Sequence, residues 1–137
     1  MAFSGPLEDR LAIRELIDAY ADATMLRDAE AWAALWADDA EWSLPDFPEY
    51  GDTVGKAAIV AKWILAVQAH PGLVYVATPG AIEVEGDHAS ARIYTSEVYA
   101  SASGGSRRRR GRYDDRLVKR DGRWYIQAHR FHTLHEE

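Results

Sequence analysis

The 137-residue sequence contains no cysteine, which excludes disulfide bonds, thiolate metal sites and a cysteine nucleophile. It has no apolar run long enough to cross a bilayer, and its amino terminus lacks the basic region and apolar stretch of a secretion signal. It also has no glycine-rich phosphate-binding loop and no other cofactor motif. These absences predict a soluble, cytoplasmic protein that needs no cofactor and does not bind a membrane.

The sequence has fewer basic than acidic residues, 16 against 22, but its basic residues are clustered. The formal net charge of -6 argues against general affinity for nucleic acid, yet half of the 16 lysines and arginines lie between Arg107 and Arg120. Arg107–Arg110 follow the serine- and glycine-rich segment Ser101–Ser106, and no aromatic residue alternates with these arginines as a base-stacking surface requires. We predict a solvated loop at a flexible hairpin tip, with an anion-binding or partner-binding site as the alternative.

The length predicts a single domain over residues 1–137, because a chain of this size buries roughly 68% of the surface that its unfolded form exposes. No internal repeat and no second domain is visible in the sequence. We expect residues 1–6 to form a flexible amino-terminal tail.

The amino-terminal half has the apolar spacing of helices, interrupted by a strand and a loop. Apolar residues recur at three- and four-residue spacing from Leu7 to Met25 and again after Lys56, where Pro71 stops the pattern. Asp28 is suited to cap a short helix between them. The expected elements are helices over Leu7–Met25, Asp28–Trp36 and Lys56–His70, a strand over Ala40–Leu44 and a loop over Asp46–Thr53.

The carboxyl-terminal half has the pattern of a four-stranded antiparallel meander. Its last hairpin folds over Asp121-Gly122, because glycine accepts the positive φ of a tight turn. A two-residue loop places Arg130 opposite Tyr113, whereas a three-residue loop with a glycine bulge places His129 there. Periodicity does not choose, because the second arm has large side chains on both parities: Trp124 and Ile126 on one, Tyr125, His129 and Phe131 on the other. The expected strands are Leu73–Val84, Ala89–Ala100, Arg109–Lys119 and Arg123–Thr133.

Two phrases of the sequence resemble the SnoaL-like branch of the nuclear transport factor 2-like superfamily: YADATMLRDAEAWAALWADDAEW near the front and GRYDDRLVKRDGRW near the end. The resemblance covers nearly the whole chain. It implies an α+β, cone-shaped fold in which three N-terminal helices pack on a strongly curved, mainly antiparallel sheet that encloses one apolar pocket. Members of this branch include scytalone dehydratase, a dehydrochlorinase, polyketide cyclases and a steroid isomerase. The resemblance therefore implies a pocket for a small apolar or aromatic molecule.

The dehydratase-like members of the family place a tyrosine late in the first helix, an aspartate soon after it and a histidine on the first strand of the meander. By position, the resemblance carries these residues onto Tyr20, Met25 and Tyr75. An Asp-His pair works because the carboxylate orients the imidazole and stabilises its charged form while the imidazole takes a proton. Methionine and tyrosine cannot do this at neutral pH, so the usual base of the family is absent here.

Glu97 is the best candidate to replace that base. It shares its strand parity with Ala91 and Ile93, on the side that faces the helices, where a carboxylate is costly unless it is paired or useful. In an apolar cone, burial would raise the pKa of Glu97 toward the range useful for proton abstraction. The alternative is a structural Glu97 neutralised by an arginine such as Arg112. Turns centred on Gly86, near Gly105 and at Asp121-Gly122 would place four side chains opposite one another in one row across the pocket face: Tyr75, Glu97, Tyr113 and His129.

The other candidate residues also have structural alternatives. A buried tyrosine is often a core aromatic with its hydroxyl satisfied, and a lone histidine is often structural. His129, His132 and His135 are spaced by three and alternate faces on a strand, so we predict no metal site. The predicted catalytic partners of Glu97 are His129, Tyr20, Tyr75 and Tyr113.

The predicted function is cofactor-free proton-transfer chemistry on a small apolar or aromatic molecule: dehydration, isomerisation or cyclisation by a lyase or an isomerase. The alternative is a non-catalytic ligand-binding protein or accessory subunit with the same fold. We also expect a homodimer through the sheet, because helices cover only one of its faces and exposed apolar surface is usually buried. The residues expected on that outer face are Tyr94, Val98, Trp124 and Ile126.

Overall fold

One six-stranded sheet organises the computed structural model, which describes residues 2–137. Its strand order is β2-β1-β6-β5-β4-β3, and every neighbouring pair is antiparallel except β1 and β6, which run parallel. The predicted α+β class and the antiparallel meander of the last four strands are confirmed. The strands are β1 (Trp36–Ser43), β2 (Asp52–Val54), β3 (Val74–Glu85), β4 (His88–Ala100), β5 (Ser106–Arg120) and β6 (Arg123–Glu136).

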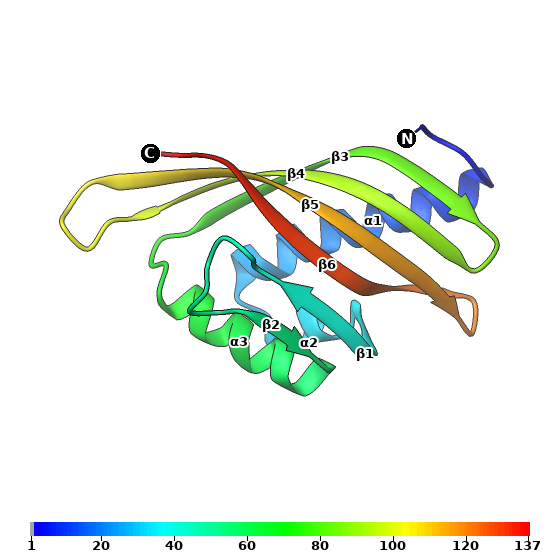
Figure 1. The fold of residues 1–137 in the computed structure, drawn as a ribbon, viewed down its shortest axis with the longest axis horizontal. Coiled ribbons are helices and arrows are strands. Elements are labelled where there is room, and N and C mark those ends of the chain that lie inside the picture. Colours follow the sequence, from blue (N-terminus) through cyan, green and yellow to red (C-terminus); the bar gives the residue numbers. More distant parts are fainter. Residues whose placement is uncertain (1) are drawn as a thin grey trace.

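The helices pack on the sheet with their apolar sides. The first helix lies along β3 and the third lies beside β1 and β2, while the tip of the β4–β5 hairpin, drawn in yellow, projects past the helices (Figure 1). The Asp28 carboxylate caps the second helix as predicted, because it accepts a hydrogen bond from the Ala31 N–H at 3.0 Å. The helices are α1 (Leu7–Leu26), α2 (Ala29–Ala33) and α3 (Lys56–Gln68).

Strand β1 differs from the prediction, because it begins at Trp36 and not at Ala40. The helix expected over Asp28–Trp36 ends at Ala33, and the pair Asp38-Asp39 is exposed in the middle of the strand, between the fully buried Trp36 and Ala40. The strand lies between β6 and β2, the latter a short strand that the prediction left inside a loop. Burial of Trp36 therefore outweighs the polar character of Asp38-Asp39, and the segment forms a strand with these two side chains exposed.

The arginine cluster is also placed differently from the prediction. Strand β5 begins at Ser106, directly opposite Ala100, so the loop at the hairpin tip contains only residues 101–105. Arg107–Arg110 are strand residues with β4 on one side, and Arg109 and Arg110 also pair with β6. The predicted loop is therefore wrong, although Arg107, Arg108 and Arg110 are exposed to solvent as expected.

A β-bulge at Gln127 resolves the mixed pattern of β6. The turn at Asp121-Gly122 has the two-residue form, with Arg120 opposite Arg123, but the pairing shifts between Leu117–Ile126 and Arg116–Ala128. The extra residue reverses the parity of the residues that follow it, so even-numbered side chains before it and odd-numbered side chains after it lie on the same face. The core side of β6 therefore carries Trp124, Ile126, His129 and Phe131, all buried.

Two predictions fail because of this bulge. Phe131 lies opposite Tyr113, so neither of the alternatives, Arg130 or His129, was right. Trp124 and Ile126 expose only 4% and 1% of their surface, so they do not belong to the outer face on which we expected a dimer contact.

The segment before α1 is attached to the edge of the sheet. The Ser4 N–H donates to the Ile82 carbonyl at 3.1 Å, and the Val84 N–H donates to the Ser4 carbonyl at 3.0 Å. The next residue, Gly5, has a φ of 97°, and a Cβ atom there would lie 2.6 Å from the Val84 side chain. Within residues 2–137, no helix is both long and apolar enough to cross a membrane.

Candidate functional site

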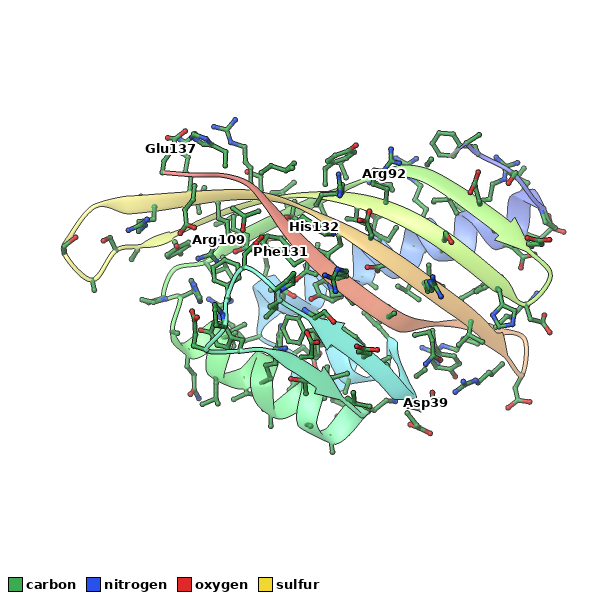
Figure 2. All side chains as sticks on the ribbon, in the orientation of Figure 1. Asp39, Arg92, Arg109, Phe131, His132 and Glu137 are labelled. Atoms are coloured by element: carbon green, nitrogen blue, oxygen red, sulfur yellow. The ribbon has the colours of Figure 1, made fainter. Side chains whose placement is uncertain are left out.

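An apolar cavity of about 80 Å³ lies between the core face of the sheet, α1, α3 and the loop of residues 44–51. Most of its lining is aromatic or aliphatic, and it opens to solvent on one side. Arg109 and Phe131 mark its sheet side in Figure 2, whereas Arg92 and Glu137 lie on the other side of the sheet. Four of the five predicted site residues line this cavity: Tyr20, Tyr75, Glu97 and Tyr113.

The predicted row of opposing side chains forms only in part. Tyr75 lies opposite Glu97, as predicted from the turn at Gly86. Glu97 lies opposite Arg109 and not Tyr113, because the β4–β5 loop is centred on Ser103 and closes earlier than expected. The side chains thus meet across the cavity from α1, β3, β4 and β5, and not along one line of paired strands.

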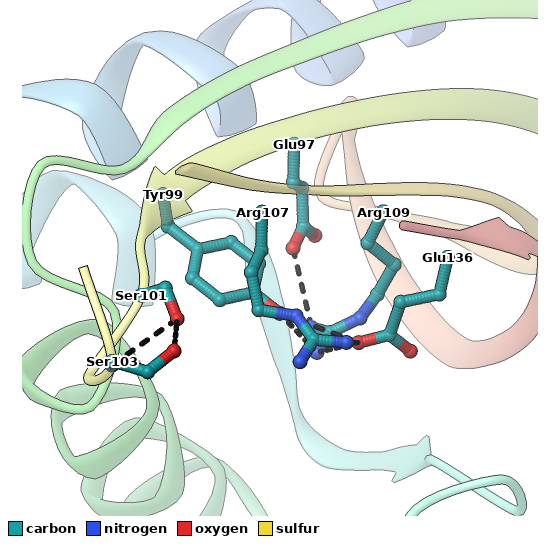
Figure 3. A network of polar contacts seen from close by, with 7 residues as sticks. All are labelled: Glu97, Tyr99, Ser101, Ser103, Arg107, Arg109 and Glu136. Atoms are coloured by element: carbon teal, nitrogen blue, oxygen red, sulfur yellow. Dashed lines mark hydrogen bonds and ion pairs between the residues drawn. The ribbon is translucent and has the colours of Figure 1, made fainter. Parts of the chain in front are cut away.

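Glu97 forms an ion pair with Arg109 at the mouth of the cavity (Figure 3). The closest oxygen and nitrogen are 3.5 Å apart, and the two side chains expose 14% and 13% of their surface. Burial raises the pKa of Glu97, while the charge of Arg109 opposes the shift. The expected neutralising arginine, Arg112, instead contacts Asp114 at 3.2 Å.

His129 is held by a hydrogen bond to a carboxylate that was not among the predicted site residues. Its Nδ1 lies 2.5 Å from Oδ1 of Asp115, and its Nε2 lies 3.2 Å from the hydroxyl of Tyr20. When Asp115 is ionised, Nδ1–H donates to it and Nε2 accepts the Tyr20 O–H. Burial raises the pKa of Asp115, and the charge and hydrogen bond of His129 oppose that rise. The chain thus contains an Asp-His pair, although at other positions than the resemblance implied.

Three phenols line the cavity, and two of them, Tyr20 and Tyr113, contact His129. The Tyr113 ring stacks on the imidazole with centroids 3.4 Å apart, and the rings of Tyr20 and Tyr75 lie 5.6 Å from each other. Burial raises the pKa of all three phenols, with Glu97 adding to the rise. These hydroxyls therefore stay protonated near neutral pH and act as hydrogen-bond donors within an apolar wall.

The position carried over from the family's aspartate does not face the cavity. Met25 exposes 45% of its surface, whereas Thr24 is buried and lines the cavity. The Thr24 hydroxyl donates to the backbone carbonyl of Tyr20 at 2.8 Å, one helical turn earlier. The cavity-facing residue after Tyr20 is therefore a threonine whose hydrogen is already engaged.

Two functional candidates were missed at the sequence level. Asp115 shares the strand parity of Tyr113 and Leu117, so the argument used for Glu97 also applied to it. Arg109 was expected where the flexible tip meets the strand Arg109–Lys119, and only the correct length of the β4–β5 loop places it beside Glu97. Within residues 2–137, no group of three or more His, Asp or Glu side chains is arranged to hold a metal ion.

The loop over the cavity is fixed on two sides. The Lys62 ammonium donates to the carbonyls of Trp42 and Gly51, at 3.2 and 3.1 Å, and to the hydroxyl of Thr53 at 3.1 Å. On the other side, the Thr133 N–H donates to the Asp46 carboxylate at 2.8 Å. Phe47 and Tyr50 of this loop then form part of the cavity wall.

This combination of a curved sheet, helices on one face and a cavity between them defines a small α+β protein of the nuclear transport factor 2-like class. A solved nuclear transport factor 2-like protein with a cystatin-like fold, from Novosphingobium aromaticivorans, is 30% identical, with a TM-score of 0.78 over 93% of this chain and 83% of that one. The chain belongs to the SnoaL-like domain family, whose model matches residues 5–130.

Other solved structures share the fold at lower identity. A type 2 hexachlorocyclohexane dehydrochlorinase is 18% identical, with a TM-score of 0.85 over 96% of this chain and 88% of that chain. A candidate scytalone dehydratase from Novosphingobium aromaticivorans is 21% identical, with a TM-score of 0.82 over 96% and 87%. No curated protein matches the chain in sequence.

Proposed function

We propose that the cavity is the ligand pocket of a cone-shaped fold, and that the protein catalyses proton transfer on a small apolar or aromatic carbonyl compound without a cofactor. The supporting observation is that a carboxylate and three phenols line one apolar cavity. A carboxylate can remove a proton next to a carbonyl, and phenols can donate to the oxygen on which negative charge develops. The reaction classes that share this step are dehydration, isomerisation and cyclisation.

In this proposal, Glu97 is the base and the phenols stabilise the oxyanion. Glu97 suits the role because burial raises its pKa toward the range useful for proton abstraction. The phenols suit the role of oxyanion stabiliser because burial raises the pKa of each one, so each can donate a hydrogen bond and keep its proton. The apolar walls strengthen both interactions by excluding water.

His129 and Asp115 act through Tyr20. The imidazole does not line the main cavity, but its Nε2 contacts the hydroxyl of Tyr20, which does. When Asp115 holds a proton and donates it to Nδ1, Nε2–H donates to the Tyr20 oxygen, which leaves the Tyr20 O–H free to donate to a ligand oxygen. His129 and Asp115 are positioning residues in this scheme, whereas Tyr20 contacts the ligand.

The names of two similar structures agree with this class of chemistry. A dehydrochlorinase removes HCl and a dehydratase removes water, so both reactions remove a proton from the substrate. Their identities of 18% and 21% support the shared fold alone. The proposal for this chain therefore depends on its own cavity.

A non-catalytic ligand-binding or accessory role is the second candidate. Two observations favour it: Glu97 is already paired with Arg109, and His129 does not line the main cavity. In that case the phenols would only orient a bound molecule.

Exchange of the α-protons of 1-indanone in D2O, followed by NMR, separates the two candidates. We expect the wild-type protein to accelerate exchange, and Glu97→Gln to remove the acceleration while 1-indanone still binds. Tyr20→Phe should reduce it by about 10- to 100-fold, since one donor to the oxyanion is lost. Binding of 1-indanone without any exchange would support the non-catalytic role.

A further inference from the structure

The Arg109 guanidinium is placed like a ligand-binding group, although its present contacts are all within the protein. Its side chain exposes 13% of its surface and lines the cavity. The ring of Phe47 lies 4.6 Å from the guanidinium carbon and the ring of Tyr99 lies 5.3 Å from it, so the charge sits between aromatic faces. An arginine in such a setting can form paired hydrogen bonds with a carboxylate that enters from the cavity.

The hydrogen-bonding capacity of Arg109 is only partly used. One terminal nitrogen reaches Glu97 at 3.5 Å, and the other reaches Glu136 at 3.3 Å and the Tyr99 hydroxyl at 3.1 Å (Figure 3). Both carboxylate contacts are long for a charge-assisted bond and involve one oxygen each. The buried Nε–H has no hydrogen-bond partner within residues 2–137.

We propose that Arg109 binds the carboxylate of a small aromatic acid, and that this carboxylate takes the place of Glu97 on the guanidinium. The aromatic ring of the acid would fill the apolar cavity, in which Phe47 and Phe131 face the ligand. This inference rests on the same cavity as the proposed function and deepens its ligand-binding candidate, because a Glu97 that has taken up a proton cannot act as the base. It names the chemical class of the ligand, an aromatic carboxylate, which the cavity's apolar walls alone do not specify.

The displacement changes the proton balance of the site. In the structure, Glu97 and Glu136 face the two cations Arg107 and Arg109, so the cluster is neutral when all four are ionised. A ligand carboxylate adds one negative charge and separates Glu97 from its counter-ion, so Glu97 takes up a proton from solvent. The new O–H bond of Glu97 replaces an O–H or N–H bond that breaks in the buffer acid, and no other covalent bond changes.

Other groups around Glu97 bear on this proton uptake. The phenols donate hydrogen bonds and carry no charge, because burial raises the pKa of each one that lines the deep part of the cavity. The charged carboxylate next to the cluster is Glu136, and its nearest cations are the two arginines named above. The titratable or charged groups that face Glu97 or share the cavity with it are Tyr20 on α1, Tyr50 in the loop of residues 44–51, His70 after α3, Tyr75 on β3, Tyr99 on β4, Arg109 and Tyr113 on β5, and Glu136 on β6.

Benzoate and benzamide form a matched pair of probes, because they differ chiefly in charge. Isothermal titration at pH 7 should show benzoate binding about tenfold or more tightly than benzamide, since a charge-assisted hydrogen bond is the difference. Arg109→Gln should remove this preference, while Arg110→Gln on the same strand should keep it, because Arg110 contacts Glu137 and does not line the cavity. A preference that survives in Arg109→Gln, or disappears in Arg110→Gln, would overturn the inference.

Proton uptake gives a second readout. Titrations in phosphate and in Tris, which differ in ionisation enthalpy, should show uptake of a proton with benzoate and none with benzamide. Glu97→Gln should abolish the uptake and retain the preference for benzoate. If Arg109→Gln does not fold because it leaves Glu97 buried and unpaired, the double variant Glu97→Gln/Arg109→Gln removes both charges together and should also lack the preference.

The two arms of the experiment separate this inference from the function proposed above. Binding of benzamide with no tighter binding of benzoate would refute the carboxylate site and leave an apolar ligand pocket in place. Absence of binding by both probes would refute the carboxylate site together with the pocket for small aromatic molecules.

Discussion

Nδ1 of His129 lies 2.5 Å from Oδ1 of Asp115, and the two side chains expose only 3% and 2% of their surface. The pair exists because β5 and β6 set these residues directly opposite each other after the bulge at Gln127. A charged or polar pair so deeply buried stabilises a fold only if both members are present, since one alone leaves an uncompensated group.

His129→Leu should therefore lower the free energy of unfolding by about 3–5 kcal/mol, because Asp115 is left buried without its partner. The double variant Asp115→Leu/His129→Leu should recover part of that loss, since it buries no polar group. Urea unfolding measures both. The control is Asp114→Asn on the same strand, whose half-exposed side chain predicts a change within about 0.5 kcal/mol. Equal stability of His129→Leu and the control would contradict the argument.

Deletion of Gln127 should be tolerated, which is unusual for the middle of a strand. Without this residue, Trp124, Ile126, His129 and Phe131 fall on one uninterrupted parity and still face the core. Deletion of Arg130 has the opposite effect, because it turns Phe131 away from the face that His129 occupies. Circular dichroism and thermal melting should show a cooperative transition for the first deletion and not for the second. Loss of the fold in both would mean that the bulge itself is required.

This bulge also marks the limit of sequence-based prediction for this chain. The Asp121-Gly122 turn, the helices and the pairing of Tyr75 with Glu97 follow from local signals such as glycine, capping and helical spacing. The register beyond a bulge does not, because one extra residue reverses every later side chain. Large residues on both parities of β6 indicated the bulge, but the prediction assumed that side chains alternate regularly along the whole strand.

The candidate site was predictable to a similar extent. Parity placed Glu97 and Tyr113 toward the helices, and both line the cavity. Arg109 was hidden by the length of the β4–β5 loop, since the loop was expected to be centred near Gly105 and is centred on Ser103. Asp115 was overlooked although it carries the same signal as Glu97, a carboxylate on an apolar parity.

Glu97 should make stability depend on pH in a defined direction. Burial raises the pKa of its carboxyl in the folded protein, whereas an unfolded glutamate has a pKa of about 4.3. The folded state therefore favours the protonated form, so the contribution of Glu97 to stability is fully present below about pH 4.3 and is lost as pH rises through the folded pKa. Glu97→Gln cannot ionise and lacks this loss.

The measurement is urea unfolding of wild type and Glu97→Gln at a series of pH values from 4 to 7. The stability of the variant relative to wild type should increase with pH over this range. The exposed Glu85→Gln serves as the control and should follow wild type throughout. A difference that is constant with pH would show that Arg109 cancels the effect of burial.

Lys62 should control the loop over the cavity. Lys62→Met removes the donor to two backbone carbonyls and one hydroxyl, which predicts a loss of about 1–3 kcal/mol in the free energy of unfolding. Chymotrypsin should then cleave faster after Tyr50, which Gly51 follows, whereas Pro48 blocks cleavage after Phe47. Lys56→Met is the matched control, because Lys56 is on the same helix and contacts the exposed Asp38 at 3.5 Å, so cleavage should stay at the wild-type rate.

The cavity volume gives this loop a second role. An aromatic ligand such as benzene occupies an apolar cavity of roughly 150 Å³, which exceeds the 80 Å³ present here. Phe47 and Tyr50 therefore have to shift for a ring to enter fully. If Lys62→Met loosens the loop, 1-indanone should associate faster in stopped-flow experiments, and an unchanged rate would show that the loop does not limit entry.

The outer face of the sheet carries the last prediction. We propose that the protein forms a homodimer through this face, where Val74, Val76 and Tyr94 expose 50%, 52% and 43% of their surface. These side chains lie on β3 and β4 beside the half-buried Val98, which pairs with Val74. A twofold dimer would bury the same patch on both copies, which removes it from water without requiring a second kind of partner.

Val76→Glu would place a charge inside that contact, so light scattering at tens of micromolar should report a dimer for wild type and a monomer for the variant. Leu65→Glu is the control, because Leu65 exposes 63% of its surface on α3, away from the patch, and should leave the dimer intact. A wild-type monomer at this concentration, or a dimer that persists in Val76→Glu, would rule out this face as the interface.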